Sequence, residues 1–137
     1  MEISKKQKQK IKEVAEEHSL RLVLLFGSRA TGKMHKESDF DVAYLSEKNL
    51  SFDDEVDINF QFTLIFPQKK CKVDTVDIRH GNPLLLFRIS KESILLYGSR
   101  EDFMKFKLRA FKMYNDYAPY FEMEKKLNKK IIAGYAN

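Results

Sequence analysis

The 137-residue sequence contains one cysteine, Cys71, and no run of apolar residues long enough to cross a membrane. A single cysteine cannot form an internal disulfide, which points to a reducing compartment. The longest apolar runs, at 22–26 and 84–87, fall far short of the roughly 20 residues that a membrane-spanning helix needs. The N-terminal segment MEISKKQKQKIKEVAEE has no apolar stretch resembling a signal peptide. These absences predict a soluble, cytoplasmic protein without membrane association.

Internal repeats and low-complexity linkers are also absent from the sequence. With 43% hydrophobic residues, a chain of this length can bury one sizeable core, so a single domain is predicted. The net charge of +5 favours anionic ligands, but only weakly, because 20 acidic residues are interspersed with 25 basic ones. The lysines at 5, 6, 8, 10 and 12 fit the solvated face of a first helix, and a nucleic-acid or partner-binding patch is the alternative.

Hydrophobic periodicity predicts alternating helices and strands. Ile11, Val14 and Ala15 fall near one stripe of a first helix, and the apolar run RLVLLF suits a strand buried on both faces. Pro83 is well placed to open a short helix. Helices are predicted at 4–18, 83–90 and from 101 onward, and strands at 21–26, 39–45, 73–78 and 94–97.

Residues 51–66 fit two patterns. Their apolar residues alternate from Val56 to Phe66, as they would in a strand. However, Ser51 and Asp54 match a capping box, and the acidic run at 53–55 suits a helix N-terminus. An uninterrupted segment of this length is also long for a strand. We therefore predict a helix.

The C-terminal part of the sequence carries an aromatic stripe at helical spacing. We predict that this stripe packs in the core and that Pro119 interrupts its helix. Accordingly, 1–118 is the predicted domain, and 119–137 is a lysine-rich tail that either docks loosely or binds a partner. The stripe comprises Phe103, Phe106, Ala110, Phe111, Tyr114 and Tyr117.

The segment GSRATGKMHKESDFD, residues 27–41, is compatible with two kinds of nucleotide site. Its first seven residues satisfy the G-x-x-x-x-G-K pattern of a P-loop. However, Met34 stands where a P-loop needs a hydroxyl for Mg²⁺, and a thioether cannot replace it. The span from Met34 to Ser38 is also too short for the long helix that follows a P-loop. The P-loop interpretation is therefore disfavoured.

Asp39 and Asp41 favour the other kind of site. Side chains alternate along a strand, so both carboxylates emerge on one face, roughly 6 to 7 Å apart, while Phe40 points to the other face. Two carboxylates this close favour a divalent cation, and Mg²⁺ accepts carboxylates together with substrate phosphates and water. The structural alternative is a strand edge with two solvated aspartates.

Other polar residues carry weaker signals. Arg29 and Lys33 could neutralise phosphate charge, although loop cations are commonly just solvated. The histidines show no metal-site spacing and are predicted to lie on the surface. They are His18, His35 and His80.

The context of the aspartate pair carries a family resemblance. Gly27-Ser28 follows a buried strand, ten residues separate Ser28 from Asp39, and a further acidic strand, VDTVD, lies downstream. This arrangement resembles the nucleotidyltransferase superfamily of DNA polymerase beta and kanamycin nucleotidyltransferase. The size of the chain and the segment PLLLFRISKESILLYG look most like its minimal members, over residues 1 to about 115. The resemblance implies an α/β nucleotidyltransferase fold, a small mixed sheet of about four strands flanked by helices.

The resemblance also implies roles for particular residues. In this family a Gly-Ser turn binds the β- and γ-phosphates of a nucleotide, which corresponds here to Gly27 and Ser28. Asp39 and Asp41 would hold Mg²⁺, and a third carboxylate, Asp74 in preference to Asp77, would serve a second ion or act as a base. Arg29, Lys33 and Ser38 complete the predicted nucleotide-binding set.

The resemblance implies transfer of AMP from ATP to an acceptor hydroxyl, with release of pyrophosphate; other nucleotides remain open. Minimal family members resemble antitoxins that pair with a HEPN-domain ribonuclease toxin and adenylylate one of its tyrosines. The expected partner is therefore a HEPN-domain toxin in a hetero-oligomer, and direct nucleic-acid binding is not expected. Two alternatives stay open: an antitoxin that only binds, and a subunit that modifies a small molecule or an RNA end.

Overall fold

A computed structural model describes residues 3–32, 39–66 and 72–136 of the chain. Most predicted boundaries lie within two residues of those observed. The elements in chain order are α1 (Lys5–Glu17), β1 (Leu20–Phe26), α2 (Ser28–Thr31), β2 (Phe40–Ser46), α3 (Phe52–Ile65), β3 (Val73–Asp77), α4 (Pro83–Glu92), β4 (Ile94–Tyr97) and α5 (Arg100–Ala136).

The strands form one mixed sheet in the order β3-β2-β1-β4. β1 runs antiparallel to both of its neighbours, whereas β2 and β3 are parallel. The predicted mixed sheet of about four strands is thus confirmed. Because β1 is central, its side chains are buried on both faces of the sheet, which explains its continuous apolar sequence.

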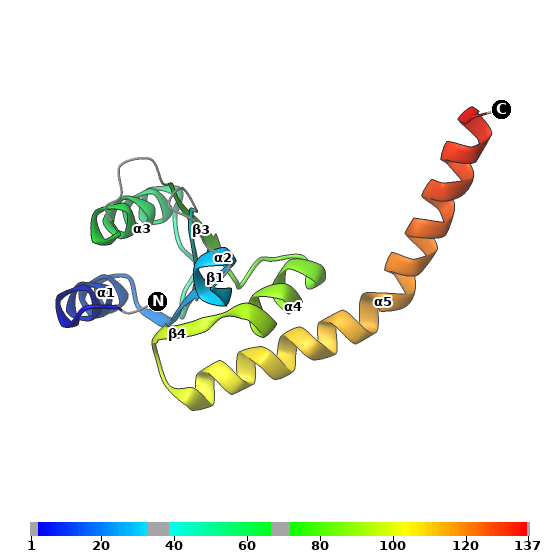
Figure 1. Cartoon of the computed structure of the whole chain (residues 1–137). Helices are drawn as coiled ribbons and strands as arrows, with labels where there is room; N and C mark the ends of the chain where they lie inside the picture. The colour runs from blue at the N-terminus through cyan, green and yellow to red at the C-terminus, as the bar shows by residue number, and fades with distance from the viewer. Residues whose placement is uncertain (1–2, 33–38, 67–71, 137) are drawn as a thin grey trace.

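Helices cover both faces of this sheet (Figure 1). Val23 and Leu25 of β1 pack in a cluster with α1 and α3. Leu22 and Leu24 point the other way, into a cluster with α4 and α5. Alternate residues of one strand therefore belong to different layers, and the layer of a side chain tells which face of the sheet it occupies.

Residues 51–66 form the predicted helix. Ser51 caps α3: its hydroxyl accepts the backbone N–H of Asp54 at 3.1 Å, and the Asp54 carboxylate accepts the N–H of Ser51 at 3.1 Å. Ile58, Phe62 and Ile65 are buried at helical spacing. The capping box, rather than the alternating apolar residues, decided the structure of this segment.

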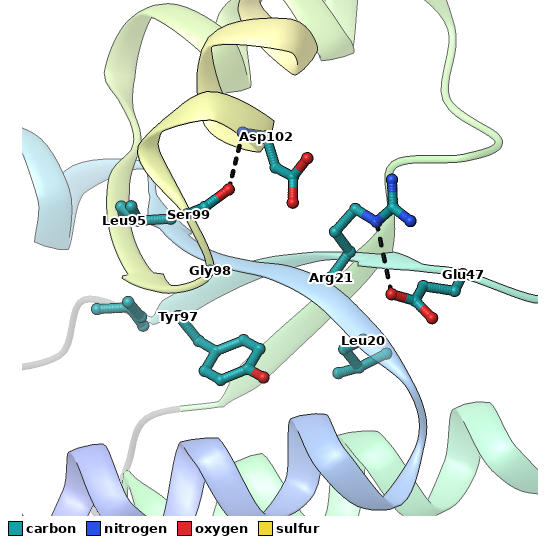
Figure 2. A pocket seen from close by; sticks show the side chains of 9 residues that line it. Leu20, Arg21, Glu47, Leu95, Tyr97, Gly98, Ser99 and Asp102 are labelled. Atoms are coloured by element: carbon teal, nitrogen blue, oxygen red, sulfur yellow. Dashed lines mark hydrogen bonds and ion pairs between the residues drawn. The ribbon is translucent and has the colours of Figure 1, made fainter.

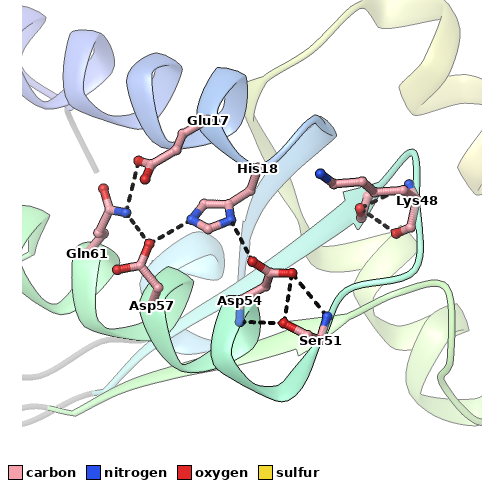
Figure 3. Close-up of polar contacts among 8 residues, drawn as sticks. Glu17, His18, Lys48, Ser51, Asp54, Asp57 and Gln61 are labelled. Carbon is pink, nitrogen blue, oxygen red and sulfur yellow. Dashed lines mark hydrogen bonds and ion pairs between the residues drawn. The ribbon is translucent and has the colours of Figure 1, made fainter.

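His18 is buried, so its predicted place on the surface is wrong (Figure 3). Its Nε2 atom lies 2.7 Å from Oδ2 of Asp57 in α3, and its Nδ1 atom lies 3.8 Å from Oδ1 of Asp54. Gln61 donates to the same Asp57 oxygen and to Glu17 of α1. The hydrogen bond from His18 lowers the pKa of Asp57, while capping by Ser51 is the main cause that lowers the pKa of Asp54. The network ties the end of α1 to α3.

Replacing His18 by Leu is expected to lower thermal stability at pH 5 by more than it does at pH 3. A lowered carboxylate pKa contributes stability above the usual pKa of about 4, and this contribution is lost as the pH falls through the lowered value. Melting curves of both proteins at the two pH values measure the effect. An equal loss at both would mean that His18 acts only by filling space.

α5 continues as a helix through Pro119 to Ala136, so the predicted interruption is wrong. Figure 1 shows instead that α5 changes direction in its orange part, as a proline inside a helix causes by removing a hydrogen bond and crowding the preceding turn. The last part of α5 projects away from the sheet. Among the described residues, no helix, α5 included, is apolar over a length that could cross a membrane.

The predicted core role of the α5 aromatic stripe is only partly correct. Phe106 and Ala110 are buried against the sheet. Phe111 and Tyr117 are 56% and 48% exposed. Tyr114 instead stacks on Phe87 of α4, with ring centroids 4.0 Å apart. Phe111 directly follows the buried Ala110 and so lies on another side of the helix, whereas Tyr117 lies beyond Met113, the last residue of α5 that packs against the core.

Candidate functional site

Asp41 and Asp74 are brought side by side by the parallel pairing of β2 and β3, in which they are register partners. Ala43, two residues after Asp41, lies in the α4/α5 cluster, so Asp41 faces the same layer. Asp39 immediately precedes β2 and accepts the backbone N–H of Lys72 at 3.0 Å. The three carboxylates therefore gather at the N-terminal ends of two adjacent strands.

Asp77 occupies the other face of β3. It pairs in register with Tyr44, which belongs to the α1/α3 cluster. Burial, and secondarily the Asp77 charge, raise the pKa of the Tyr44 hydroxyl. The Asp77 carboxylate also accepts the backbone N–H of Arg79 at 2.9 Å. Asp77 therefore lies apart from the other acids, as alternation along a strand requires.

The electrostatics of Asp41 favour a cation. Burial, followed by the neighbouring Asp74 charge, raises the pKa of Asp41; Asp39 adds to the rise, and the positive charge of Arg88 opposes it. The ionised form of Asp41 is thus disfavoured in the protein alone. A divalent cation among these oxygens would reverse that cost, since carboxylates are ligands that Mg²⁺ accepts.

Gly27, in the turn after β1, lies against the carboxylate of Asp41. Its φ of +76° and ψ of −156° lie in a region that is essentially restricted to glycine. A Cβ atom at this position would overlap the carboxylate of Asp41. Ser28, half-buried, then begins the single turn of α2. Only glycine therefore allows this turn and Asp41 to lie in contact.

Replacing Gly27 by Ala is expected to destabilise the protein by about 2 to 4 kcal/mol, because backbone strain adds to the overlap with Asp41. Gly32 is the matched control: its φ is also positive, at +80°, but an added Cβ would have nothing within 4 Å. Its replacement by Ala should cost only about 1 kcal/mol. Denaturant unfolding of the two variants compares them, and equal losses would refute the close approach of Gly27 and Asp41.

The other residues of the predicted nucleotide-binding set have different positions. Arg29 is buried, and its guanidinium carbon lies 4.2 Å from the ring centroid of Phe40, a residue of the α1/α3 cluster. This contact places Arg29 on the side of the sheet away from Asp41. Lys33 and Ser38 lie outside the described residues. The roles of these three residues stay predictions.

A cavity of about 620 Å³ lies at the other end of β1 (Figure 2). Its wall includes Arg21, which pairs with Glu47 at 3.6 Å, and Ser99, whose hydroxyl accepts the backbone N–H of Asp102 at 3.0 Å. These polar groups already have partners within the wall. The cavity is separate from the carboxylate group, because Arg21 lies near the start of β1 and Gly27 at its end.

Among the described residues, the group of candidate metal ligands whose atoms all lie within 4.8 Å of one another consists of Glu17, His18 and Asp57, and not of the three aspartates. The side-chain amide of Gln61 donates to Glu17 at 3.1 Å and to Asp57 at 2.6 Å (Figure 3). Asp57 already hydrogen-bonds His18 and the Gln61 amide, and Glu17 hydrogen-bonds the same amide. We therefore interpret the group as a structural link between α1 and α3.

The sequence of residues 9–102 matches the family model described as polymerase beta, nucleotidyltransferase. This span contains the turn at Gly27 and all three carboxylates. The chain belongs to the polymerase beta nucleotidyltransferase family. The matched span runs from within α1 to the start of α5.

Relatives of the chain include the protein adenylyltransferase MntA of Aphanizomenon flos-aquae, 32% identical over 98 residues that cover 66% of this chain and 65% of the relative. The chain thus spans about two thirds of the length of the curated relatives that it matches. Its fold is similar to that of two solved structures. One is a toxin-antitoxin with AMP-PNP, with a TM-score of 0.74, 24% identity and coverage of 88% of this chain and 97% of the other. The second is a tri-AMPylated Shewanella oneidensis HEPN toxin in complex with an MNT antitoxin, with a TM-score of 0.68, 21% identity and coverage of 88% and 95%.

Proposed function

We propose that this nucleotidyltransferase transfers AMP from ATP to a tyrosine of a HEPN-domain toxin and so acts as the antitoxin. The observation that carries the proposal is the meeting of Asp41, Asp74 and Gly27 at one end of the sheet. The name of the MntA relative supports a protein acceptor, and the tri-AMPylated toxin in the similar complex supports a HEPN-domain partner.

Asp39 and Asp41 would hold Mg²⁺, and Asp74 would contribute to a second ion or act as the base. When bound, Mg²⁺ would neutralise the triphosphate and polarise its phosphoryl oxygens. The backbone of the turn at Gly27 and the hydroxyl of Ser28 would bind the terminal phosphates, since glycine permits close approach of the backbone to an anion. These residues would orient ATP with its α-phosphorus toward Asp74.

In the transfer step, the tyrosine oxygen of the partner attacks the α-phosphorus of ATP. A new P–O bond forms, the bond between the α-phosphorus and the bridging oxygen breaks, and pyrophosphate leaves. The exposed carboxylate of Asp74 accepts the proton of the tyrosine hydroxyl. A general base is needed, because a free tyrosine has a pKa of about 10.

The projecting part of α5 is the proposed docking surface for the toxin. Tyr120, Met123, Leu127 and Ile131 recur every three or four residues, and each is at least 49% exposed. One face of an isolated helix is rarely apolar over this length unless another chain covers it. A helical HEPN partner could pack on this stripe and present its tyrosine to the carboxylate group.

Incubation with the co-encoded HEPN-domain protein, ATP and Mg²⁺ tests the proposal. Mass spectrometry of the partner should show a gain of one or more AMP units, and its ribonuclease activity should fall in parallel. No mass gain, together with full neutralisation by the Asp39→Asn/Asp41→Asn double variant, would favour an antitoxin that acts by binding alone. AMP on a small molecule or an RNA end would identify a different acceptor.

The other product distinguishes this chemistry from that of a P-loop enzyme. We expect pyrophosphate in an amount equal to the AMP transferred, without formation of ADP, because attack occurs at the α-phosphorus. β2 begins at Phe40, so the segment between Gly32 and this strand is too short for the long helix of a P-loop. Chromatography of the nucleotides measures the products, and stoichiometric ADP with phosphate would contradict the assignment.

A further inference from the structure

Arg88 lies on the helix that covers the carboxylate face of the sheet. Leu86 and Ile89 of α4 are buried in the same cluster as Ala43, which follows Asp41 on that face of β2. Arg88 itself is largely exposed, with a side-chain exposure of 58%. It therefore stands at the border between the packed face of α4 and solvent, over the layer into which Asp41 points.

α5 contacts the sheet at the end opposite the carboxylates. Arg109 of α5 donates to the carbonyl of Ile78 at 2.7 Å, and Ile78 directly follows the last residue of β3. Asp74, by contrast, is the second residue of β3. Of the two helices on this face, α4 is accordingly the one whose cations are available to the carboxylates. β4, which follows α4 almost directly, pairs Ile94 with Leu25, and the next residue, Phe26, pairs with Asp41. The end of α4 that carries Arg88 therefore lies toward the acidic end of the sheet.

The contact that holds Arg88 is easily exchanged. Its Nε atom lies 3.3 Å from Oε2 of Glu92, one helical turn away. Exposed ion pairs one helical turn apart stabilise a protein only weakly. Arg88, together with Asn82 and Lys91, also lines a cavity of about 540 Å³ along α4. The guanidinium can therefore move to another anion at little cost.

Binding of the nucleotide triphosphate would favour a further positively charged side chain near the carboxylates. Three carboxylates and a triphosphate remain negative in sum even with two divalent ions among them. Arg29, one of the predicted phosphate contacts, stacks on Phe40 at the other side of the sheet. A guanidinium suits the task, because its planar fork donates two parallel hydrogen bonds to phosphate oxygens.

We propose that Arg88 is a phosphate-binding residue of the carboxylate site, held by Glu92 until the triphosphate of Mg²⁺–ATP replaces that carboxylate. The inference rests on the proposed nucleotidyl transfer and adds a residue that lies outside the segment from Gly27 to Asp41. It assigns a function to the ion pair between Arg88 and Glu92: the pair competes with the nucleotide.

Calorimetric titration of the whole chain with Mg²⁺–AMP-PNP and with Mg²⁺–tripolyphosphate tests this inference. Arg88→Gln should weaken both by about 10- to 100-fold, the loss expected for a charge-assisted contact. Arg88→Lys should recover part of the affinity. Glu92→Gln should change binding in the opposite direction, tightening it by about two- to fivefold, and this gain should vanish in the double variant with Arg88→Gln.

Lys91→Gln is the matched control, because it removes the same charge from α4 three residues after Arg88. It should change affinity by less than about threefold. Melting temperatures of all variants should agree closely, since the exchanged side chains are exposed. If the unmodified protein binds AMP-PNP and Arg88→Gln binds it equally well, the role of Arg88 is refuted while the proposed function stands. If the unmodified protein binds neither probe in the presence of Mg²⁺, both fail.

Discussion

Asp41→Asn is expected to lower AMP transfer by at least about a hundredfold while raising thermal stability at neutral pH. The loss follows because an amide is a poor replacement for a carboxylate that holds Mg²⁺ against the triphosphate. The gain follows from the environment of Asp41, whose pKa is raised by burial and by Asp74. A raised carboxylate pKa means that ionisation destabilises the fold, so removing the charge stabilises it.

The pH dependence of this gain gives an internal check. Below the pKa of Asp41 the carboxyl is protonated and resembles the amide, so the difference in melting temperature should vanish. It should appear as the pH rises above about 4 and through the raised pKa. Melting curves without added metal at pH 3 and pH 7 measure it, and mass spectrometry of the acceptor measures transfer.

Asp77→Asn is the matched control for the acidic site. It removes the same charge from the neighbouring strand β3, but from the face that carries Tyr44. AMP transfer should stay within about threefold of the unmodified protein, whereas Asp74→Asn should lower it as Asp41→Asn does. Transfer that survives Asp74→Asn and fails with Asp77→Asn would mean that the wrong carboxylate has been assigned to the site.

Leu127→Asp combined with Ile131→Asp is expected to weaken binding of the HEPN-domain partner by at least about a hundredfold. Each substitution places a charge in a contact that would otherwise bury an aliphatic side chain, at a cost of about 1.5 to 3 kcal/mol. The sheet lies far from this part of α5 in Figure 1, so the melting temperature of the domain should hardly change. Analytical ultracentrifugation or calorimetry with the partner measures the affinity.

The control for this surface is Lys125→Asp combined with Lys129→Asp. Both lysines lie about half a turn from Leu127 on the same helix, so they face away from the apolar stripe. Partner binding should fall much less than with the aliphatic pair. The loss of AMP–toxin formation in the aliphatic variant, with Mg²⁺–AMP-PNP binding retained, would separate docking from nucleotide binding. Equal losses from both pairs would show that the stripe is not the contact surface.

Local patterns predicted most of the fold because each has a local physical cause. The capping box at Ser51 identified α3 although its apolar residues alternate. The errors concern residues whose surroundings come from elsewhere in the chain. His18 was expected on the surface, but α3 supplies Asp57 as its partner. Pro119 was expected to end a helix, and the helix bends and continues. Lone histidines and prolines carry little information without their neighbours in space.

The sequence by itself determined the family and the mixed α/β fold, and it predicted that Asp39 and Asp41 lie on one face of a strand. These follow from short-range periodicity and from one motif. The family pattern already favoured Asp74 over Asp77, but only the tertiary structure shows how Asp74 meets Asp41 and which cation lies near. Asp74 meets Asp41 through the register between two strands, and α4 carries Arg88 over the same face of the sheet. Register and helix packing depend on the whole core rather than on adjacent residues, so no local pattern in the chain encodes them.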